Sequence, residues 1–345
     1  MELVHQLVHD RRAFLQSLSL GAAVLAAVRP GGAATASSGK KLAGVFPIGS
    51  SPFTADNKLD LDGLASQVEF CQRGGVHGCV WPQIASAWTT LSERERLDGA
   101  EAIIAAGKGG ATAVVIGVQA PEMASIVRYA KHAAQLGADA IVSLPPADQN
   151  DEKALLDYYR QIGSVTELPL FVQSTGSMSV DLLLEMFRTI PTFHHVKDEA
   201  GDPLKRVTEI RERSRDQLKV FSGFGVQTMI TEMDLGFSGH CPYVTVADLY
   251  AAAYDLWHNG QKREAFDMFG RIQALNSMVA TNTFEVLIAR GILKPGAKSR
   301  EVAAAAAPGA AAPGAAAPPR RRAPPMTIEE IRQTLKTYLG PYLKS

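Results

Sequence analysis

A repeated alternation of two segment types runs through most of this chain and constrains its fold more than any other feature. Short apolar runs rich in β-branched residues are each followed by a turn and then by a segment whose apolar residues recur at three- and four-residue intervals. In segment 121–137, for example, Ile126, Tyr129, Ala130 and Ala133 fall on one helical face. Eight strand-like runs fit the pattern, at residues 42–48, 78–82, 112–118, 139–145, 168–173, 193–197, 218–223 and 236–242.

The helical segments between these runs predict the architecture. Eight strand and helix units in series favour a closed (β/α)₈ barrel, the TIM-barrel fold. The alternative is an open, doubly wound sheet, which carries a glycine-rich phosphate-binding turn after its first strand. The turn at 49–58 reads GSSPFTADNK and lacks that pattern. Helices are predicted near 60–74, 92–108, 121–137, 151–165, 179–189, 202–213, 225–235 and 244–258, followed by a C-terminal helical extension near 260–278 and 280–292.

Composition divides the chain into five parts, of which the first is a candidate export signal. It contains Arg11 and Arg12, then a short Ala/Gly/Leu run and the cleavage-like Ala34-Thr35-Ala36, which together resemble a twin-arginine signal. We therefore expect an exported, extracytoplasmic protein; a leader that is never cleaved is the alternative. The five predicted parts are the signal at 1–36, the barrel at 37–258, C-terminal helices at 259–294, an Ala/Pro/Gly-rich linker at 295–325 and a terminal helix at 326–345.

The charge balance argues against two classes of partner. Lys plus Arg and Asp plus Glu number 35 each, so no net field attracts nucleic acid or an anionic membrane surface. No run of about 20 apolar residues is present to span a bilayer, so no stable membrane insertion is expected after processing. Cys71, Cys79 and Cys241 lack the paired spacing of a zinc site, and His240 beside Cys241 has no further clustered ligand. We expect no metal, no organic cofactor and buried, unreactive thiols.

A lysine at the end of the sixth predicted strand is the main candidate for chemistry. In a (β/α)₈ barrel the reacting groups lie at the C-terminal ends of the strands. Strand alternation places Lys197 on the same face as His195, and His194 and Val196 on the other. If the first face is the barrel interior, desolvation disfavours the charged amine and makes it nucleophilic. Such an amine condenses with a 2-oxo acid to form an imine; an ordinary solvated charge at the strand end is the alternative.

Four segments of the sequence resemble one enzyme family. They are KDEAGD at 197–202, the stretch 44–82, YAKHAAQLGADAIVSLPP at 129–146 and FSGF at 221–224. Over about residues 42–293 the chain is similar to the dihydrodipicolinate synthase and N-acetylneuraminate lyase family. The resemblance implies a (β/α)₈ barrel with C-terminal helices, a homo-oligomer (a tetramer or dimer), a small-molecule substrate, and Schiff-base chemistry on pyruvate or a related 2-oxo acid through Lys197.

Other positions that match the family's site differ from it in kind. Family members carry a tyrosine as proton carrier at the end of the fifth strand, where this sequence has Gln173, whose amide cannot exchange protons as a phenol does. The arginine that binds a second carboxylate in the synthases is missing from 174–179, so the synthase reaction itself is not expected. The family's Gly-Thr-Thr-Gly-Glu loop, which holds the substrate carboxylate, corresponds to 83–87. The expected substrate contacts are therefore Gln83, Ile84, Ala85 and Ser86, together with Ser222 and Gly223 of the FSGF segment.

Two side chains are candidates to replace the missing tyrosine. His195 could act as the acid or base, or could be a hydrogen-bonded core residue. Tyr243, after the eighth strand, could supply a phenol or simply pack. Asp198 and Glu199 follow the lysine and either orient it or lie in solvent before the next helix.

Three functions are compatible with these residues. The first is a lyase or aldolase of the class I type, which forms an imine between Lys197 and a 2-oxo acid or related carbonyl substrate. The second is a catalytically silent binding protein in which Lys197 is a fixed cation for a small carboxylate; the loss of the tyrosine and the threonine pair favours it. The third is a dehydratase or hydratase that uses the same lysine and the same imine.

Overall fold

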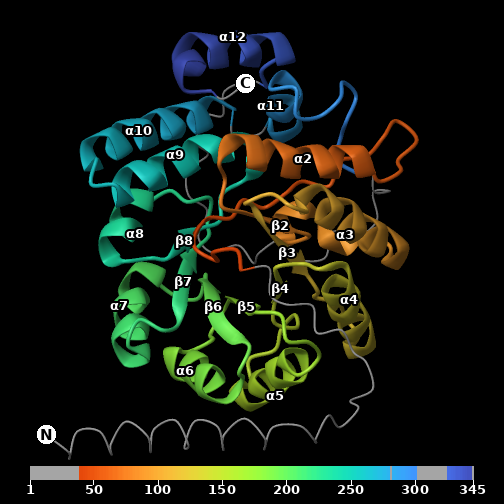
Figure 1. The fold of residues 1–345 in the computed structure, drawn as a ribbon, viewed down its shortest axis with the longest axis vertical. Helices are drawn as coiled ribbons and strands as arrows, with labels where there is room; N and C mark the ends of the chain where they lie inside the picture. The colour runs from red at the N-terminus through yellow and green to blue at the C-terminus, as the bar shows by residue number, and fades with distance from the viewer. Residues whose placement is uncertain (1–38, 280–281, 301–324, 344–345) are drawn as a thin grey trace, which may run out of the picture. The chain divides into compact units, whose positions relative to one another are not determined.

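The computed structural model describes residues 39–279, 282–300 and 325–343 (Figure 1). The predicted export signal and most of the predicted linker lie outside these residues. Within the described ranges, no helix is both long and apolar enough to cross a membrane. Figure 1 shows a central ring of strands with helices around it.

Eight parallel strands form one sheet that closes into a ring. Each strand pairs with its neighbour in sequence from β2 to β8, and β8 pairs with β1. A parallel bridge between Ile48 and Val80 joins the two ends, with Val80 N donating to Pro47 O at 3.0 Å. The predicted TIM barrel is confirmed. The strands are β1 (Gly44–Val45), β2 (Gly78–Trp81), β3 (Ala113–Gly117), β4 (Ala140–Ser143), β5 (Leu170–Ser174), β6 (Phe193–Asp198), β7 (Lys219–Ser222) and β8 (Gly239–His240).

A helix follows each strand and lies on the outside of the ring (Figure 1). Four of these helices begin at a side chain that accepts a backbone N–H of the first turn, namely Asp60, Ser92, Asp151 and Ser179. Such caps satisfy donors that have no partner inside the helix. The helices are α2 (Leu61–Gly74), α3 (Glu93–Gly107), α4 (Met123–Leu136), α5 (Glu152–Gly163), α6 (Val180–Thr189), α7 (Pro203–Ser214), α8 (Met229–Leu235) and α9 (Ala247–His258).

Aromatic rings fill the interior of the barrel. The ring centroid of Phe221 lies 5.3 Å from that of Phe46 and 5.2 Å from that of Phe171, both in edge-to-face contact. A Cβ atom on Gly239 would lie 2.2 Å from the Phe221 ring, so only glycine fits beside it. The barrel interior is therefore a packed core. A second, larger core lies between the strands and the surrounding helices.

Three helices form the C-terminal extension, α10 (Lys262–Val279), α11 (Thr283–Ala289) and α12 (Ile328–Leu339), with α12 beyond α11 in Figure 1. A buried ion pair ties this extension to the barrel, because both terminal nitrogens of Arg290 donate to the carboxylate of Asp248, at 2.8 and 2.7 Å. The start of the predicted linker is ordered, since Phe53 and Lys298 exchange backbone hydrogen bonds. The barrel thus keeps contact with the chain as far as residue 300.

Removing the carboxylate of Asp248 should destabilise the protein. In Asp248→Ala the guanidinium of Arg290 stays buried without a counter-charge, which costs about 3–5 kcal/mol of unfolding free energy. Urea denaturation followed by circular dichroism measures the loss. The exposed pair of Asp62 and Lys294 gives the control, because Asp62→Ala should leave the urea midpoint unchanged. Equal midpoints for Asp248→Ala and the wild type would contradict this account.

Candidate active site

The end of β6 places Lys197 inside the mouth of the barrel. Its side chain is on the interior side of the strand, while its neighbour Val196 belongs to the outer core. In the sheet register it pairs with Gln173 of β5 and with Phe221 of β7. The residue is 9% exposed and lines a cavity of about 300 Å³, here called the lysine cavity. This volume is at the lower end of the range of about 300–1,000 Å³ that holds small ligands.

Glu199 is the anionic partner of this lysine. Its Oε1 atom lies 3.2 Å from Nζ of Lys197 and accepts the backbone N–H of Phe224 at 3.0 Å. Its Oε2 atom accepts a hydrogen bond from Nε2 of Gln173 at 2.5 Å. Both charged side chains are largely buried. Among the described residues that line the lysine cavity, no others are charged.

The neighbouring acid, Asp198, points the other way. Its carboxylate accepts hydrogen bonds from Oγ of Ser174 and from Nε of Arg206, the latter at 3.0 Å. Burial raises the pKa of Asp198, although the hydrogen bond from Ser174 and the charge of Arg206 act in the opposite direction. Asp198 therefore connects β5, β6 and α7, and Glu199 alone of the two acids faces the cavity.

Gly223 leaves room for the ion pair. A Cβ atom at this position would lie 1.7 Å from Oε1 of Glu199 and 2.7 Å from Cε of Lys197. Any larger residue would displace one of the two charged side chains. Gly223 is predicted as a substrate contact, but it is not among the residues that line the lysine cavity; in the structure its missing Cβ makes room for the ion pair.

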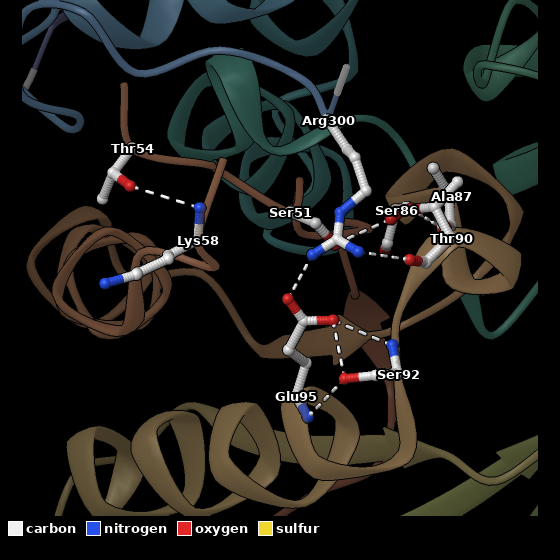
Figure 2. A network of polar contacts seen from close by, with 9 residues as sticks. All are labelled: Ser51, Thr54, Lys58, Ser86, Ala87, Thr90, Ser92, Glu95 and Arg300. Atoms are coloured by element: carbon white, nitrogen blue, oxygen red, sulfur yellow. Dashed lines mark hydrogen bonds and ion pairs between the residues drawn. The ribbon is translucent and has the colours of Figure 1, made fainter. Parts of the chain in front are cut away.

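The loop after β2 forms one wall of the lysine cavity. Gln83, Ile84 and Ala85 line it, as the sequence predicts. Ser86 does not face the cavity, because its Oγ donates to Gly49 O at 2.6 Å and accepts from Gln83 N at 3.0 Å. Its carbonyl in turn accepts Oγ of Ser51 at 2.7 Å (Figure 2). The prediction that Ser86 contacts the substrate is therefore wrong; its hydrogen bonds stabilise the loop instead.

Arg300 binds the C-terminal end of the same loop, near Thr90 (Figure 2). Its guanidinium donates to Thr90 O at 2.9 Å and pairs with the carboxylate of Glu95. The other oxygen of Glu95 accepts from N and Oγ of Ser92 at 2.8 and 2.9 Å. The guanidinium also stacks on the ring of Phe53, 4.3 Å from its centroid. Arg300, two residues after the strand partner of Phe53, therefore supports the loop that carries Gln83.

Exposed apolar side chains surround the cavity opening. Ile84, Phe224 and Tyr243 line the lysine cavity and are 60%, 63% and 53% exposed. Gln227 and Tyr243 also line a second cavity of about 380 Å³ that reaches α10 and α11. The two cavities therefore adjoin each other, and Tyr243, which is about half exposed, lines both of them.

Ser222 faces the helices instead of the cavity. Because Phe221 points into the barrel, alternation turns Ser222 outward. Its hydroxyl donates to Oε2 of Glu232 at 2.5 Å and lies 3.0 Å from Nδ1 of His240. Burial raises the pKa of Glu232, but the hydrogen bond and charge of His240, followed by the hydrogen bond from Ser222, leave it lowered. The prediction that Ser222 contacts the substrate is therefore wrong; it belongs to a buried polar group with Glu232 and His240 on the helix side of the strands.

His195 lies in the barrel interior but does not reach the lysine cavity. Its ring stacks on Phe171, with 4.4 Å between centroids, and it lines a separate cavity beside Leu42 and Lys219 at the other end of the barrel. Burial, together with the charges of His194 and Lys219, lowers the pKa of His195 to about 3. The prediction that His195 is catalytic is therefore wrong. His195 precedes Lys197 by two residues on β6, about 7 Å along the strand, and lies in the part of the barrel away from the lysine cavity.

Several cavity residues are missing from the sequence prediction. Phe224, Gln227 and Cys241 line the lysine cavity beside the predicted residues. Of the two acids that the sequence offers to orient the lysine, Glu199 is the one that contacts the amine. The KDEAGD segment shows an acid two positions after the lysine, but only the turn after β6 decides where it points. In the described part of the chain, no group of three or more His, Cys, Asp or Glu side chains is placed to hold a metal ion.

The fold and site together define a (β/α)₈ barrel whose mouth holds a buried lysine amine. A family model described as the dihydrodipicolinate synthetase family matches residues 41–304. The chain belongs to this family.

Individual relatives agree with the assignment. The 4-hydroxy-tetrahydrodipicolinate synthase of Methanococcoides burtonii is 28% identical over 256 residues, which cover 72% of this chain and 87% of that protein. The dihydrodipicolinate synthase structure from Rhodopseudomonas palustris has a TM-score of 0.69 at 21% identity, with 86% and 97% coverage. The sialic acid aldolase structure from Ruminococcus gnavus has a TM-score of 0.72 at 16% identity, with 87% and 99% coverage. At these identities the two structures show a shared fold.

A neutral residue in place of His195 should flatten the acid side of the stability profile. A pKa lowered to about 3 means that the folded state resists protonation that the unfolded chain accepts near pH 6.5. Stability from this group is present above pH 6.5 and is lost as the pH falls toward 3, by at most about 1.4 kcal/mol per pH unit. In His195→Gln this contribution should vanish. Urea midpoints between pH 4 and 7 measure the slope, and an unchanged slope would contradict the assignment.

Proposed function

We propose that this protein is a lyase of the class I aldolase type, which binds a 2-oxo acid or related carbonyl substrate as an imine on Lys197. One observation carries the proposal: a lysine amine lies almost fully buried in a cavity at the C-terminal rim of a closed barrel. Membership of the dihydrodipicolinate synthetase family supports the same class. So do the names of two relatives, a synthase and an aldolase.

The covalent chemistry joins the amine of Lys197 to the substrate carbonyl. The nitrogen of Lys197 adds to the carbonyl carbon, the oxygen leaves as water and a C=N bond forms. The protonated imine accepts the electron pair released when a bond to the adjacent carbon breaks, which gives an enamine. Return of a proton to that carbon restores the imine, and water hydrolyses it to free the lysine. A dehydratase forms the same imine and loses a proton from the adjacent carbon to give the enamine, which then expels the hydroxyl of the next carbon as water; it therefore also lies within the proposal.

The cavity wall argues against the synthase reaction itself. The described lining residues of the lysine cavity include no arginine, so a second substrate carboxylate would have no cationic partner. Gln173 occupies the position of the family tyrosine and donates to Glu199. We therefore place the substrate among compounds with one carboxylate.

A silent binding protein is the second candidate. The ion pair between Lys197 and Glu199 favours it, because a paired ammonium is a fixed cation and a poor nucleophile. In that case pyruvate would raise the thermal midpoint without covalent bond formation, and Lys197→Arg would keep part of the affinity. Turnover that disappears in Lys197→Ala would exclude this candidate.

Reductive trapping tests the lyase proposal. Sodium cyanoborohydride with pyruvate, or with a panel of 2-oxo acids, should add the mass of the reduced adduct to the peptide that contains Lys197. Lys197→Ala should remove the adduct entirely, since no other described amine lines the cavity. Peptide mass spectrometry measures both results.

A second lysine gives the matched control. Lys205, in α7, is exposed and pairs with Asp202, so Lys205→Ala should label like the wild type. A wild-type Lys197 that stays unmodified across the whole panel would overturn the proposal.

A further inference from the structure

We propose that Glu199 is the proton carrier of the site, and that Gln173 positions it. This inference rests on the proposed imine chemistry and extends it. It assigns to an acid two residues after the lysine the work that a tyrosine performs elsewhere in the family.

The contacts of the carboxylate fit this role. Oε1 lies 3.2 Å from Nζ of Lys197, within reach of direct proton transfer to the reacting nitrogen. The backbone N–H of Phe224 and the side-chain amide of Gln173 hold the two oxygens from two other strand ends. A carboxylate with both oxygens held keeps its geometry while a substrate enters.

The other titratable groups near the cavity fit the role poorly. His195 lines a different cavity. Burial raises the pKa of the Cys241 thiol to about 12, which keeps it protonated at neutral pH. Tyr243 is half exposed at the rim. Within the described lining of the lysine cavity, Glu199 is the one carboxylate.

Gln173 has a defined orientation that serves Glu199. Its Nε2 donates to the carboxylate, so the amide cannot be turned the other way without facing oxygen to oxygen. Its Oε1 is buried and has no hydrogen-bond partner in the described structure. The residue at the family's tyrosine position therefore fixes the acid in place of supplying one itself.

The proton inventory balances with Glu199 as the only carrier. In the resting pair, the ammonium of Lys197 gives one proton to the carboxylate and becomes a free amine. The amine adds to the substrate carbonyl, and Glu199 gives its proton to the oxygen while it takes one from the nitrogen. A second transfer from Glu199 to the hydroxyl releases water and leaves a protonated imine beside a carboxylate. One ammonium and one ketone have become one iminium and one water.

Burial makes this exchange effective. Both side chains are nearly nine-tenths covered, so bulk water screens the pair less than it would screen an exposed pair. Gly223 permits this close packing because it has no Cβ.

The rate of trapping tests the assignment on the full chain. With pyruvate and sodium cyanoborohydride, Glu199→Gln should slow adduct formation at Lys197 on the order of 10²–10⁴-fold, the usual contribution of a general acid and base. Asp202→Asn is the matched control, since that acid lies three residues further on, half exposed and paired with Lys205. It should trap at the wild-type rate.

Rescue separates a chemical role from a structural one. Added formate should restore a large part of the trapping rate in Glu199→Ala, because a small carboxylate can fill the space that the side chain leaves. Gln173→Leu should slow trapping less than Glu199→Ala does. It should not respond to formate, because the carboxylate of Glu199 is still present and has lost only the hydrogen bond from Gln173. Should Glu199→Gln fail to fold, Glu199→Asp keeps the charge and should trap more slowly with an unchanged thermal midpoint.

The outcomes are distinct from those of the proposed function. Absence of trapping in the wild type overturns the imine itself. Normal wild-type trapping with an equally fast, folded Glu199→Gln overturns the role of Glu199 and leaves the imine standing. A formate response in Gln173→Leu equal to that in Glu199→Ala overturns the positioning role of Gln173.

Discussion

The closed ring of parallel strands is the constraint on which the site depends. The bridge between Ile48 and Val80 joins the two ends of the sheet, so the C-terminal ends of all the strands meet at one rim. Gln83, Gln173 and Lys197 come from distant parts of the sequence and meet only there. Because Phe221 and its neighbouring rings fill the interior, the open space lies at the mouth. The ion pair of Lys197 and Glu199 consequently lies at this mouth, where both side chains are nearly nine-tenths covered and screened less than an exposed pair.

The turn after β6 gives the adjacent residues Asp198 and Glu199 different surroundings and different roles. Asp198 is still within the strand and faces the helices, where Ser174 and Arg206 satisfy its carboxylate. Glu199 follows the strand and turns into the cavity, where it meets Lys197. One residue of difference thus separates an acid that stabilises the barrel from one that is available for proton transfer. The same alternation separates Gly223, which contacts the ion pair, from Ser222, which does not.

Much of the fold and part of the site could be predicted from the sequence. The eight runs of β-branched residues correspond to the eight strands, because the apolar pattern and the turns between runs are local properties. Lys197, Gln173 and Gln83 line the cavity as predicted, since strand alternation and strand ends determine them. The predictions for three other residues are wrong: none of them lines the lysine cavity, although they lie on the same strand, in the same loop or next to a site residue. They are His195, Ser86 and Ser222. Depth along the barrel and hydrogen-bond partners from other segments decided their places.

The sequence by itself determined the order of strands and helices, the lysine at the end of the sixth strand and the absence of a tyrosine from the fifth. These features depend on residues close together in the chain, so periodicity and position reveal them. Only the tertiary structure decided that Glu199 meets both Lys197 and Gln173, and that Arg300 supports the loop of Gln83. The physical reason is that these contacts join segments brought together by ring closure and core packing, and no local pattern encodes the direction in which a loop side chain turns.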